Sequence, residues 1–201
     1  MTASLTDDLL NQLQGPQLAQ IGQQLGLSES QASGAVSAAL PLLIGALGRN
    51  AGQPQGAEAL FGALQRDHAG LDIGSVLGSV LGGGGQGTQI LGHIFGDRQE
   101  TAVQGLGNAV GLGSNQASGL LKMLAPIVLA YLAKRMFAQG GNADASPQAL
   151  GNVLGQERQR IQQQDPLGGG LLGAVLDQDG DGQLGLSDLM KIGGGLLGGG
   201  R

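Results

Sequence analysis

The residues best suited to chemistry are three aspartates that alternate along one short stretch near the end of the chain. Asp177, Asp179 and Asp181 are followed at once by Gly182. Carboxylates at alternate positions converge on a hard cation when the chain curls tightly, and glycine permits the sharp turn that this requires. Without a cation, the three charges would repel one another in a closed loop. The spacing therefore predicts a cation site, with an ordinary polar turn as the alternative, because Asp and Gly are also common turn residues.

The residues that follow complete a loop of twelve positions, 177–188, which resembles the calcium-binding loop of EF-hand proteins. Position 7 of such a loop offers its backbone carbonyl, here from Gln183, and position 12 offers a carboxylate, here from Asp188. Asp188 replaces the usual bidentate Glu, and Gly185 at position 9 leaves that ligand to water. The resemblance implies one Ca²⁺ ion bound with modest affinity, for which Mg²⁺ competes. The expected ligands are Asp177, Asp179, Asp181, Gln183 and Asp188.

Two short apolar segments flank this loop. Residues 171–176 can form an entering helix, and Ser187 can cap an exiting helix that contains Leu189 and Ile192. We therefore expect an EF-hand-like helix-loop-helix at the C-terminus. A lone loop lacks the second loop with which EF-hands usually pair, and a second chain could supply it. This predicts a calcium-linked homodimer through residues 171–197, with folding back onto the helical core as the alternative.

Composition favours helices and argues against a nucleic-acid partner. Of the 201 residues 41 are Gly, while only 2% are aromatic and 12% are charged. The core must be built mainly from Leu, Val, Ile and Ala, which favours closely packed helices, since strands are enriched in aromatic residues. A net charge of −5 provides no basic surface for phosphates. The absence of cysteine excludes disulfides and thiolate catalysis.

No secretory signal and no membrane span are expected. The N-terminus lacks the basic and apolar regions of a secretory signal. The longest apolar run covers residues 123–133, well short of the roughly 20 residues that cross a bilayer. We interpret this run as a buried helix of a soluble, cytoplasmic protein.

The sequence repeats itself at a constant offset of 85 residues. Residues 26–34 match residues 111–119, and the register continues through Pro41 and Pro126. Agreement over about 45 positions without a gap indicates a duplication. We predict three regions: a first helical unit with a glycine-rich tail at 1–85, a second unit at 86–165, and a glycine-rich segment with the metal loop at 166–201.

Each unit is expected to contain three helices joined by short links. In the first unit Thr6 can cap the first helix, and the second helix ends before Gly26. Ser28 and Gln31 then form a capping box for the third. Pro41 lies inside this third helix and should bend it or restart it. The predicted fold class is all-α, with two related helical units in a helical bundle and glycine-rich linkers.

The N-terminal part of the chain resembles a bacterial family of unknown function. The resemblance rests on the leucine pair at 9–10, the turn at 27–32 and the Ala-Leu-Pro-Leu-Leu segment at 39–43. These features are similar to the YidB-like family, DUF937, over residues 5–135. The resemblance implies an all-helical protein from a bacterium, and it brings no activity, ligand or catalytic residue.

Other chemical candidates have simpler explanations. Gly82, Gly84 and Gly87 have the spacing of a dinucleotide-binding fingerprint. That motif requires a preceding strand, and none is expected here, so a flexible linker is the better interpretation. His68 and His93 stand alone, without a second ligand at metal-binding spacing, and are expected at the surface.

These observations predict a non-enzymatic helical interaction or scaffold protein whose C-terminal segment binds calcium. No nucleophile elbow, phosphate-binding loop or zinc-binding helix pattern is present. A calcium-responsive regulator is the first alternative, which paired loops and a Glu at position 12 would have favoured. A DNA-binding protein is the second, because a short helix, a Gly-Leu-Ser turn and a longer helix outline a helix-turn-helix. It would need a basic face. The sequence does not identify the protein partner.

Overall fold

The computed structural model describes residues 4–68, 72–82, 86–137 and 145–164, and every regular element in these ranges is a helix. The prediction of an all-helical chain is confirmed for this part. The predicted metal loop at 177–188 lies outside the described residues. The helices are α1 (Leu5–Leu13), α2 (Pro16–Leu25), α3 (Glu29–Ala51), α4 (Pro54–Ala63), α5 (Ile73–Leu81), α6 (Gly87–Phe95), α7 (Gln99–Val110), α8 (Ser114–Phe137) and α9 (Pro147–Gln164), with a π-helical turn η1 (Leu64–His68) and a 3₁₀ turn η2 (Gly96–Arg98).

Local signals place the starts of the first three helices. Ser4 caps α1, and its hydroxyl accepts a hydrogen bond from the Thr6 N–H at 3.2 Å. The predicted cap at Thr6 was therefore wrong by two residues. Pro16 occupies the first turn of α2, where its missing N–H would have had no helical partner. The capping box that begins α3 is confirmed, with reciprocal hydrogen bonds between Ser28 and Gln31.

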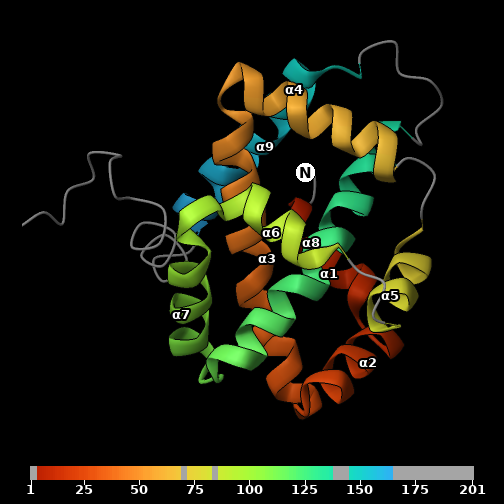
Figure 1. The fold of residues 1–201 in the computed structure, drawn as a ribbon, viewed down its shortest axis with the longest axis vertical. Coiled ribbons are helices and arrows are strands. Elements are labelled where there is room, and N and C mark those ends of the chain that lie inside the picture. Colours follow the sequence, from red (N-terminus) through yellow and green to blue (C-terminus); the bar gives the residue numbers. More distant parts are fainter. Residues whose placement is uncertain (1–3, 69–71, 83–85, 138–144, 165–201) are drawn as a thin grey trace, which may run out of the picture.

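Two long helices, α3 and α8, contact each other at the centre of the molecule, and shorter helices pack around them (Figure 1). Both are buried along much of their length, and every residue of α8 from 123 to 133 is buried. Each continues as a helix through an internal proline, Pro41 in α3 and Pro126 in α8, so neither restarts there. These two helices form the frame on which the others are placed.

Length and composition alone would allow α3 and α8 to cross a membrane. α8 has 24 residues, longer than the apolar run at 123–133 indicated. However, 67% of the most apolar window of α3 and 78% of that of α8 is buried inside the molecule. Core helices of folded proteins have the same property, so the length of these helices does not by itself indicate a membrane span.

The duplicated segments have the same backbone geometry. α2 ends at Gly26 with a φ of 65°, and α7 ends at Gly111 with a φ of 68°. A left-handed residue at this place is normally glycine, because a side chain would be strained there. An N–H also reaches back across each corner, from Leu27 to Gly22 O at 2.8 Å and from Leu112 to Gly107 O at 2.9 Å. Helices α1, α2 and α3 therefore correspond to α6, α7 and α8.

The two copies are interleaved. The amide of Asn50 in α3 donates to the carbonyl oxygens of His93 at 3.1 Å and Ile94 at 2.9 Å, at the end of α6. At the matching positions of the other copy, Arg135 of α8 lies 3.7 Å from Asp8 of α1. The third helix of each copy is thus joined to the first helix of the other.

The helices that follow each copy also pack against the other copy. α9, which follows the second copy, packs against α3 and α4, while α5 and η1, which follow the first copy, pack against α8. Small residues allow the close approach of α9. An added Cβ at Gly48 would lie 2.9 Å from the Leu154 carbonyl oxygen, and one at Gly151 would lie 3.0 Å from that of Ala51. Each copy therefore provides part of the cover over the other.

Candidate functional site

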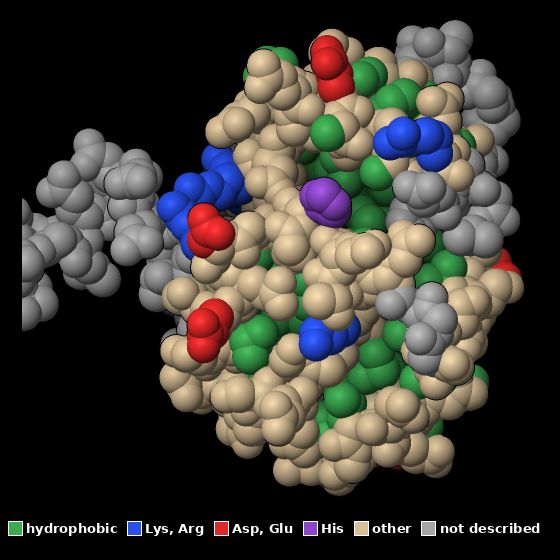
Figure 2. Space-filling view, viewed as in Figure 1, with side chains coloured by type: hydrophobic (Ala, Val, Ile, Leu, Met, Phe, Trp, Pro, Cys, Tyr) green, Lys and Arg blue, Asp and Glu red, His purple; other side chains and the backbone are tan. Residues whose placement is uncertain are grey.

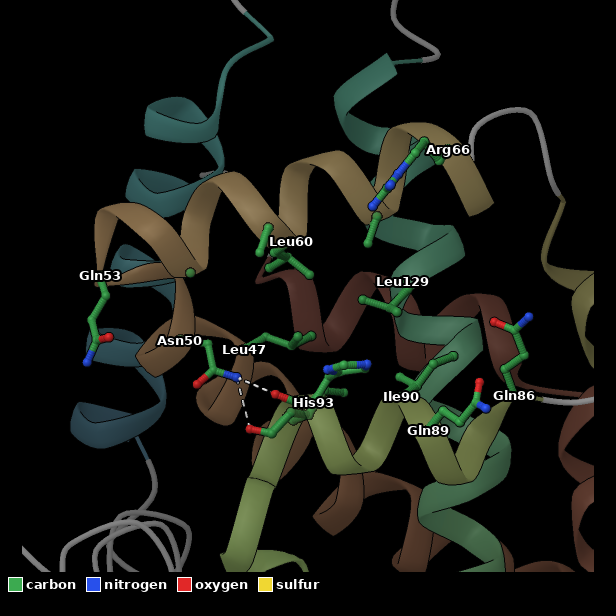
Figure 3. A pocket seen from close by; sticks show the side chains of 14 residues that line it. Leu47, Asn50, Gln53, Leu60, Arg66, Gln86, Gln89, Ile90, His93 and Leu129 are labelled. Atoms are coloured by element: carbon green, nitrogen blue, oxygen red, sulfur yellow. Dashed lines mark hydrogen bonds between the residues drawn. The ribbon is translucent and has the colours of Figure 1, made fainter.

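A pocket of about 450 Å³ opens between α4 and α6. Figure 2 shows a hollow on this face of the molecule, where hydrophobic side chains are exposed beside a histidine. α4 and α6 form the walls of the pocket, and α3 and α8 form its floor (Figure 3). Its volume lies in the range of ligand sites, and such sites have mainly apolar linings. The central apolar side chains are Leu47, Leu60, Ile90 and Leu129.

Two glycines and one side-chain amide hold α4 and α6 close to α3 and α8. Gly56 in α4 lies so close to the end of α3 that an added Cβ would clash with the carbonyl oxygen of Asn50. Gly87, at the start of α6, lies equally close to the carbonyl oxygen of Lys122 in α8. At the opposite end of α6, the Asn50 amide binds the last carbonyl oxygens of that helix. The position of each wall is therefore fixed by its contacts with α3 and α8.

Among the described residues that line the pocket, a single side chain is charged, and it lies at one end. That charge belongs to Arg66, whose Nε donates to the Gly62 carbonyl oxygen at 3.2 Å and so lies along its own helix. The amides of Gln86 and Gln89 lie at the same end on the facing wall, α6, and the exposed ring of His93 points from α6 into the hollow (Figure 3). This end therefore offers hydrogen-bond donors to a bound molecule.

The arrangement suits binding through apolar contact and hydrogen-bond donation. Within the described ranges, no carboxylate lines the pocket. Elsewhere in the same ranges, no three His, Cys, Asp or Glu side chains come close enough together to hold a metal ion. The pocket can thus hold an apolar molecule and bond to a polar group at one end of it.

A separate polar cluster joins α1 to α8. The Tyr131 hydroxyl donates to Asp8 Oδ2 at 2.6 Å and accepts from Arg135 Nη1 at 3.1 Å. Burial, followed by the hydrogen bond to Asp8, raises the pKa of Tyr131 to about 12. A phenol with this pKa is protonated at neutral pH and is poorly matched to general-base work. The cluster therefore serves as a link between helices.

Glu157 of α9 is a carboxylate that is only 3% exposed. It accepts hydrogen bonds from the Ser4 hydroxyl and from both the N–H and the hydroxyl of Thr6, the latter two at 3.2 Å. It also lies 3.9 Å from Arg160. A carboxylate at this place accepts from a backbone N–H in the first turn of α1 and interacts well with the helix dipole. Glu157 thus holds α9 against α1.

The residues singled out from the sequence have different outcomes. The predicted metal ligands Asp177, Asp179, Asp181, Gln183 and Asp188 all lie outside the described residues, so the calcium site stays a prediction.

Two other sequence candidates fall within the described part. His93 is exposed, as expected, but it also lines the pocket. Of the glycines with fingerprint spacing, Gly82 ends α5 and Gly87 begins α6. A dinucleotide-binding fingerprint follows a strand, whereas the element before Gly82 is the helix α5. The expectation that no strand precedes these glycines is therefore confirmed.

Sequence reasoning missed the pocket, because its lining comes from four helices that are far apart along the chain. No local motif joins Leu47 to Ile90 or Leu129. The one available signal was the duplication. It shows that residue 50 corresponds to residue 135 and residue 93 to residue 8, which are the positions that link the copies.

Comparison with known proteins gives one match. The sequence pattern of a family described as "Bacterial protein of unknown function (DUF937)" matches residues 7–135, which run from α1 into α8. No curated protein and no solved structure matches the chain. The matched range contains all of the pocket lining and excludes α9 and the predicted metal loop.

Proposed function

Because this chain belongs to the bacterial DUF937 family, whose function is unknown, we propose its role from its own geometry. We infer that it is a non-enzymatic helical interaction protein, with the pocket between α4 and α6 as its binding surface. One contrast carries the proposal. Tyr131 and Glu157 have their hydrogen bonds committed to links between helices, whereas the apolar pocket opens to solvent.

The binding surface can be tested with the neutral dye Nile red, whose fluorescence rises in apolar surroundings. Ala59 is an exposed residue that lines the pocket, so Ala59→Trp should fill the opening without disturbing the core. We expect the full chain to bind the dye saturably and the variant to lose at least about tenfold in affinity, since the displaced apolar contact is worth about 1.4 kcal/mol or more. Ser37→Trp, at an exposed position of α3 outside the pocket, should bind as the parent does. Equal binding by both variants would place the dye elsewhere and remove the support for this surface.

The second part of the proposal is a calcium site in the C-terminal segment. Its support is the sequence of residues 177–188, in which oxygen ligands stand at positions 1, 3, 5, 7 and 12 of an EF-hand loop. The proposed ligands are Asp177, Asp179, Asp181, the Gln183 carbonyl and Asp188. The chemistry that the ion would supply is structural, because it neutralises clustered carboxylates and orders the segment around them.

Calorimetric titration of the full chain tests this site. We expect one Ca²⁺ per chain, with a dissociation constant on the order of 10⁻⁵ to 10⁻³ M, because Asp188 and Gly185 supply fewer ligand atoms than a strong site has. Mg²⁺ should bind more weakly at the same place. An Asp177→Ala, Asp179→Ala variant that gives the same heat as the parent would show that the ion binds elsewhere.

The self-association predicted from the lone loop remains part of this proposal. Light scattering in chelator and in saturating Ca²⁺ should show a monomer and a dimer respectively. A mass that is the same in both conditions would leave the calcium site standing and exclude the calcium-linked dimer.

The DNA-binding alternative gains no support from the helix that would have to read the groove. α3 contacts α2, α7, α8 and α9, which leaves few residues free. Its exposed residues include no Lys or Arg to contact phosphates. These residues are Glu29, Ser30, Gln31, Gly34 and Ser37.

A further inference from the structure

The duplication supplies a counterpart for the pocket between α4 and α6. An offset of 85 residues relates α6 to α1 and α8 to α3, so the apolar pocket positions on α3, α6 and α8 have equivalents in the other copy. The pocket positions are consistently the more exposed: Ile90 is 9% exposed against 3% for Leu5, Ile94 is 6% against 0% for Leu9, and Leu129 is 4% against 0% for Ile44. The same surface is therefore more deeply covered in one copy than in the other.

A carboxylate is part of what covers the equivalent surface. Gln89 of the pocket corresponds to Ser4, and Ser4 with Thr6 receives the buried carboxylate of Glu157 from α9. The chain itself therefore places an acid group where its other copy leaves a pocket. Gln89 lies in the first turn of α6, at the pocket end that also contains Gln86 and Arg66 (Figure 3).

The positive charge of Arg66 in the pocket is complementary to a carboxylate, the group that occupies the equivalent surface. Arg66 is the only charged group among the described residues of the lining, and the Gln86 and Gln89 amides on the facing wall can donate hydrogen bonds (Figure 3). A guanidinium on one wall and amide donors on the other favour a carboxylate between them over a neutral group. Leu47 and Leu129 of the floor and Leu60 of the α4 wall are apolar and favour a hydrocarbon chain.

We propose that the pocket between α4 and α6 binds a free aliphatic carboxylate, with the carboxylate at the end formed by Arg66, Gln86 and Gln89. The hydrocarbon chain lies over the apolar floor formed by α3 and α8. This inference rests on the proposed function, which treats the pocket as a binding surface, and it adds the chemical class of the ligand. A volume of about 450 Å³ suits a small molecule of this kind.

The test is calorimetric titration of the full chain with decanoate, with decanol as the neutral ligand of equal chain length. A chelator keeps Ca²⁺ from binding the fatty acid or the C-terminal loop. We expect one decanoate per chain, bound about threefold to tenfold more tightly than decanol, the range that a partly exposed charged hydrogen bond provides. Ala59→Trp should abolish binding of both ligands.

Charge variants at the head-group end separate recognition from folding. Arg66→Gln should bring decanoate affinity down to that of decanol, and Gln89→Glu should lower it further by repulsion while decanol binding stays unchanged. Lys134→Gln removes the same charge from an exposed position of α8 outside the lining, and it should behave as the parent does.

The outcomes divide clearly between the two proposals. Equal binding of decanoate and decanol, both blocked by Ala59→Trp, would retain the pocket as a binding surface and overturn the carboxylate assignment. Decanoate binding that survives Ala59→Trp, or that Arg66→Gln and Gln89→Glu leave unchanged, would also overturn it. If neither decanoate, decanol nor Nile red binds, the proposed function fails with it.

Discussion

At the scale of single residues, the buried carboxylate of Glu157 determines how α9 meets α1. Its Oε1 accepts from donors of Ser4 and Thr6, and its Oε2 lies 3.9 Å from Arg160, so the cost of removing the carboxylate from water is offset locally. A group of this kind is sensitive to the loss of its charge, because the Thr6 N–H and the Ser4 and Thr6 hydroxyls would keep only a weaker partner.

We predict that Glu157→Gln lowers the free energy of unfolding by about 1–2 kcal/mol, the range for a lost charged hydrogen bond or helix cap. Urea denaturation monitored by circular dichroism measures this. Glu58→Gln, which removes the same charge from an exposed position of α4, should stay within about 0.5 kcal/mol of the parent. A variant at 157 that is as stable as the control would mean that the carboxylate does not hold the two helices together.

Tyr131 offers a second residue-scale prediction, because it is the only tyrosine in a chain without tryptophan. Its phenolate absorbance can therefore be titrated without overlap. Burial and the hydrogen bond to Asp8 raise its pKa to about 12, so we expect ionisation near pH 12 in the folded protein and near pH 10 in urea. A folded-state midpoint near 10 would contradict the burial of the Tyr131 hydroxyl together with its hydrogen bond to Asp8.

The sign of the linked stability change follows from that shift. Between pH 10 and 12 the unfolded chain has lost the phenol proton while the folded chain retains it, so deprotonation favours unfolding. The contribution of Tyr131 is complete below pH 10 and disappears as the pH rises through 12. Tyr131→Phe should show a flatter decline of melting temperature over this window than the parent.

At the scale of elements, the two equivalent corners between helices depend on a glycine that lets the chain turn back. A Cβ added at Gly107 would lie 2.8 Å from the Leu112 carbonyl oxygen, closer than real Cβ contacts allow. A Cβ added at Gly34, an exposed residue of α3, would meet no other atom within 4 Å.

These two sites form a matched pair for substitution by alanine. Gly34→Ala should stabilise the protein by up to about 1 kcal/mol, because alanine is the better helix former. Gly107→Ala makes the same change at a crowded site and should destabilise by about 1–2 kcal/mol, as overpacking does. Thermal melts of both variants provide the measurement, and equal shifts of the same sign would refute the packing of this corner.

Local signals predicted the elements better than they predicted their arrangement. The capping box at Ser28 and the helix end at Gly26 depend on neighbours within four residues, and both were correct. The cap of α1 was misplaced because Ser4 and Thr6 are both good caps by residue type. The pocket was not predictable, since it depends on how α4 and α6 cross α3, which no periodicity encodes.

At the scale of the whole molecule, α9 completes the cover over α3 although it lies beyond the part matched by the family. Residues 1–135 contain the three helices of each copy, and the sequence alone predicts that they fold without metal. The structure adds that such a fragment would expose the face of α3 that Leu150 and Leu154 cover, both fully buried.

We therefore expect a fragment of residues 1–164 to melt cooperatively in chelator, and a fragment of residues 1–135 to melt at a clearly lower temperature. Removing two buried leucines and exposing the face of α3 beneath them costs several kcal/mol. Circular dichroism melts of the two fragments at equal concentration test this. Identical melting temperatures would mean that α9 contributes nothing to the stability of the core.

The central claim is that the pocket between α4 and α6 is where this protein binds its ligand. Amide hydrogen exchange of the full chain, with and without saturating decanoate and with chelator present, tests it most directly. Decanoate bound in this pocket should slow exchange mainly in α4 and α6, with little change in α2 and α7. No protection in α4 and α6, or protection confined to other helices, would contradict it.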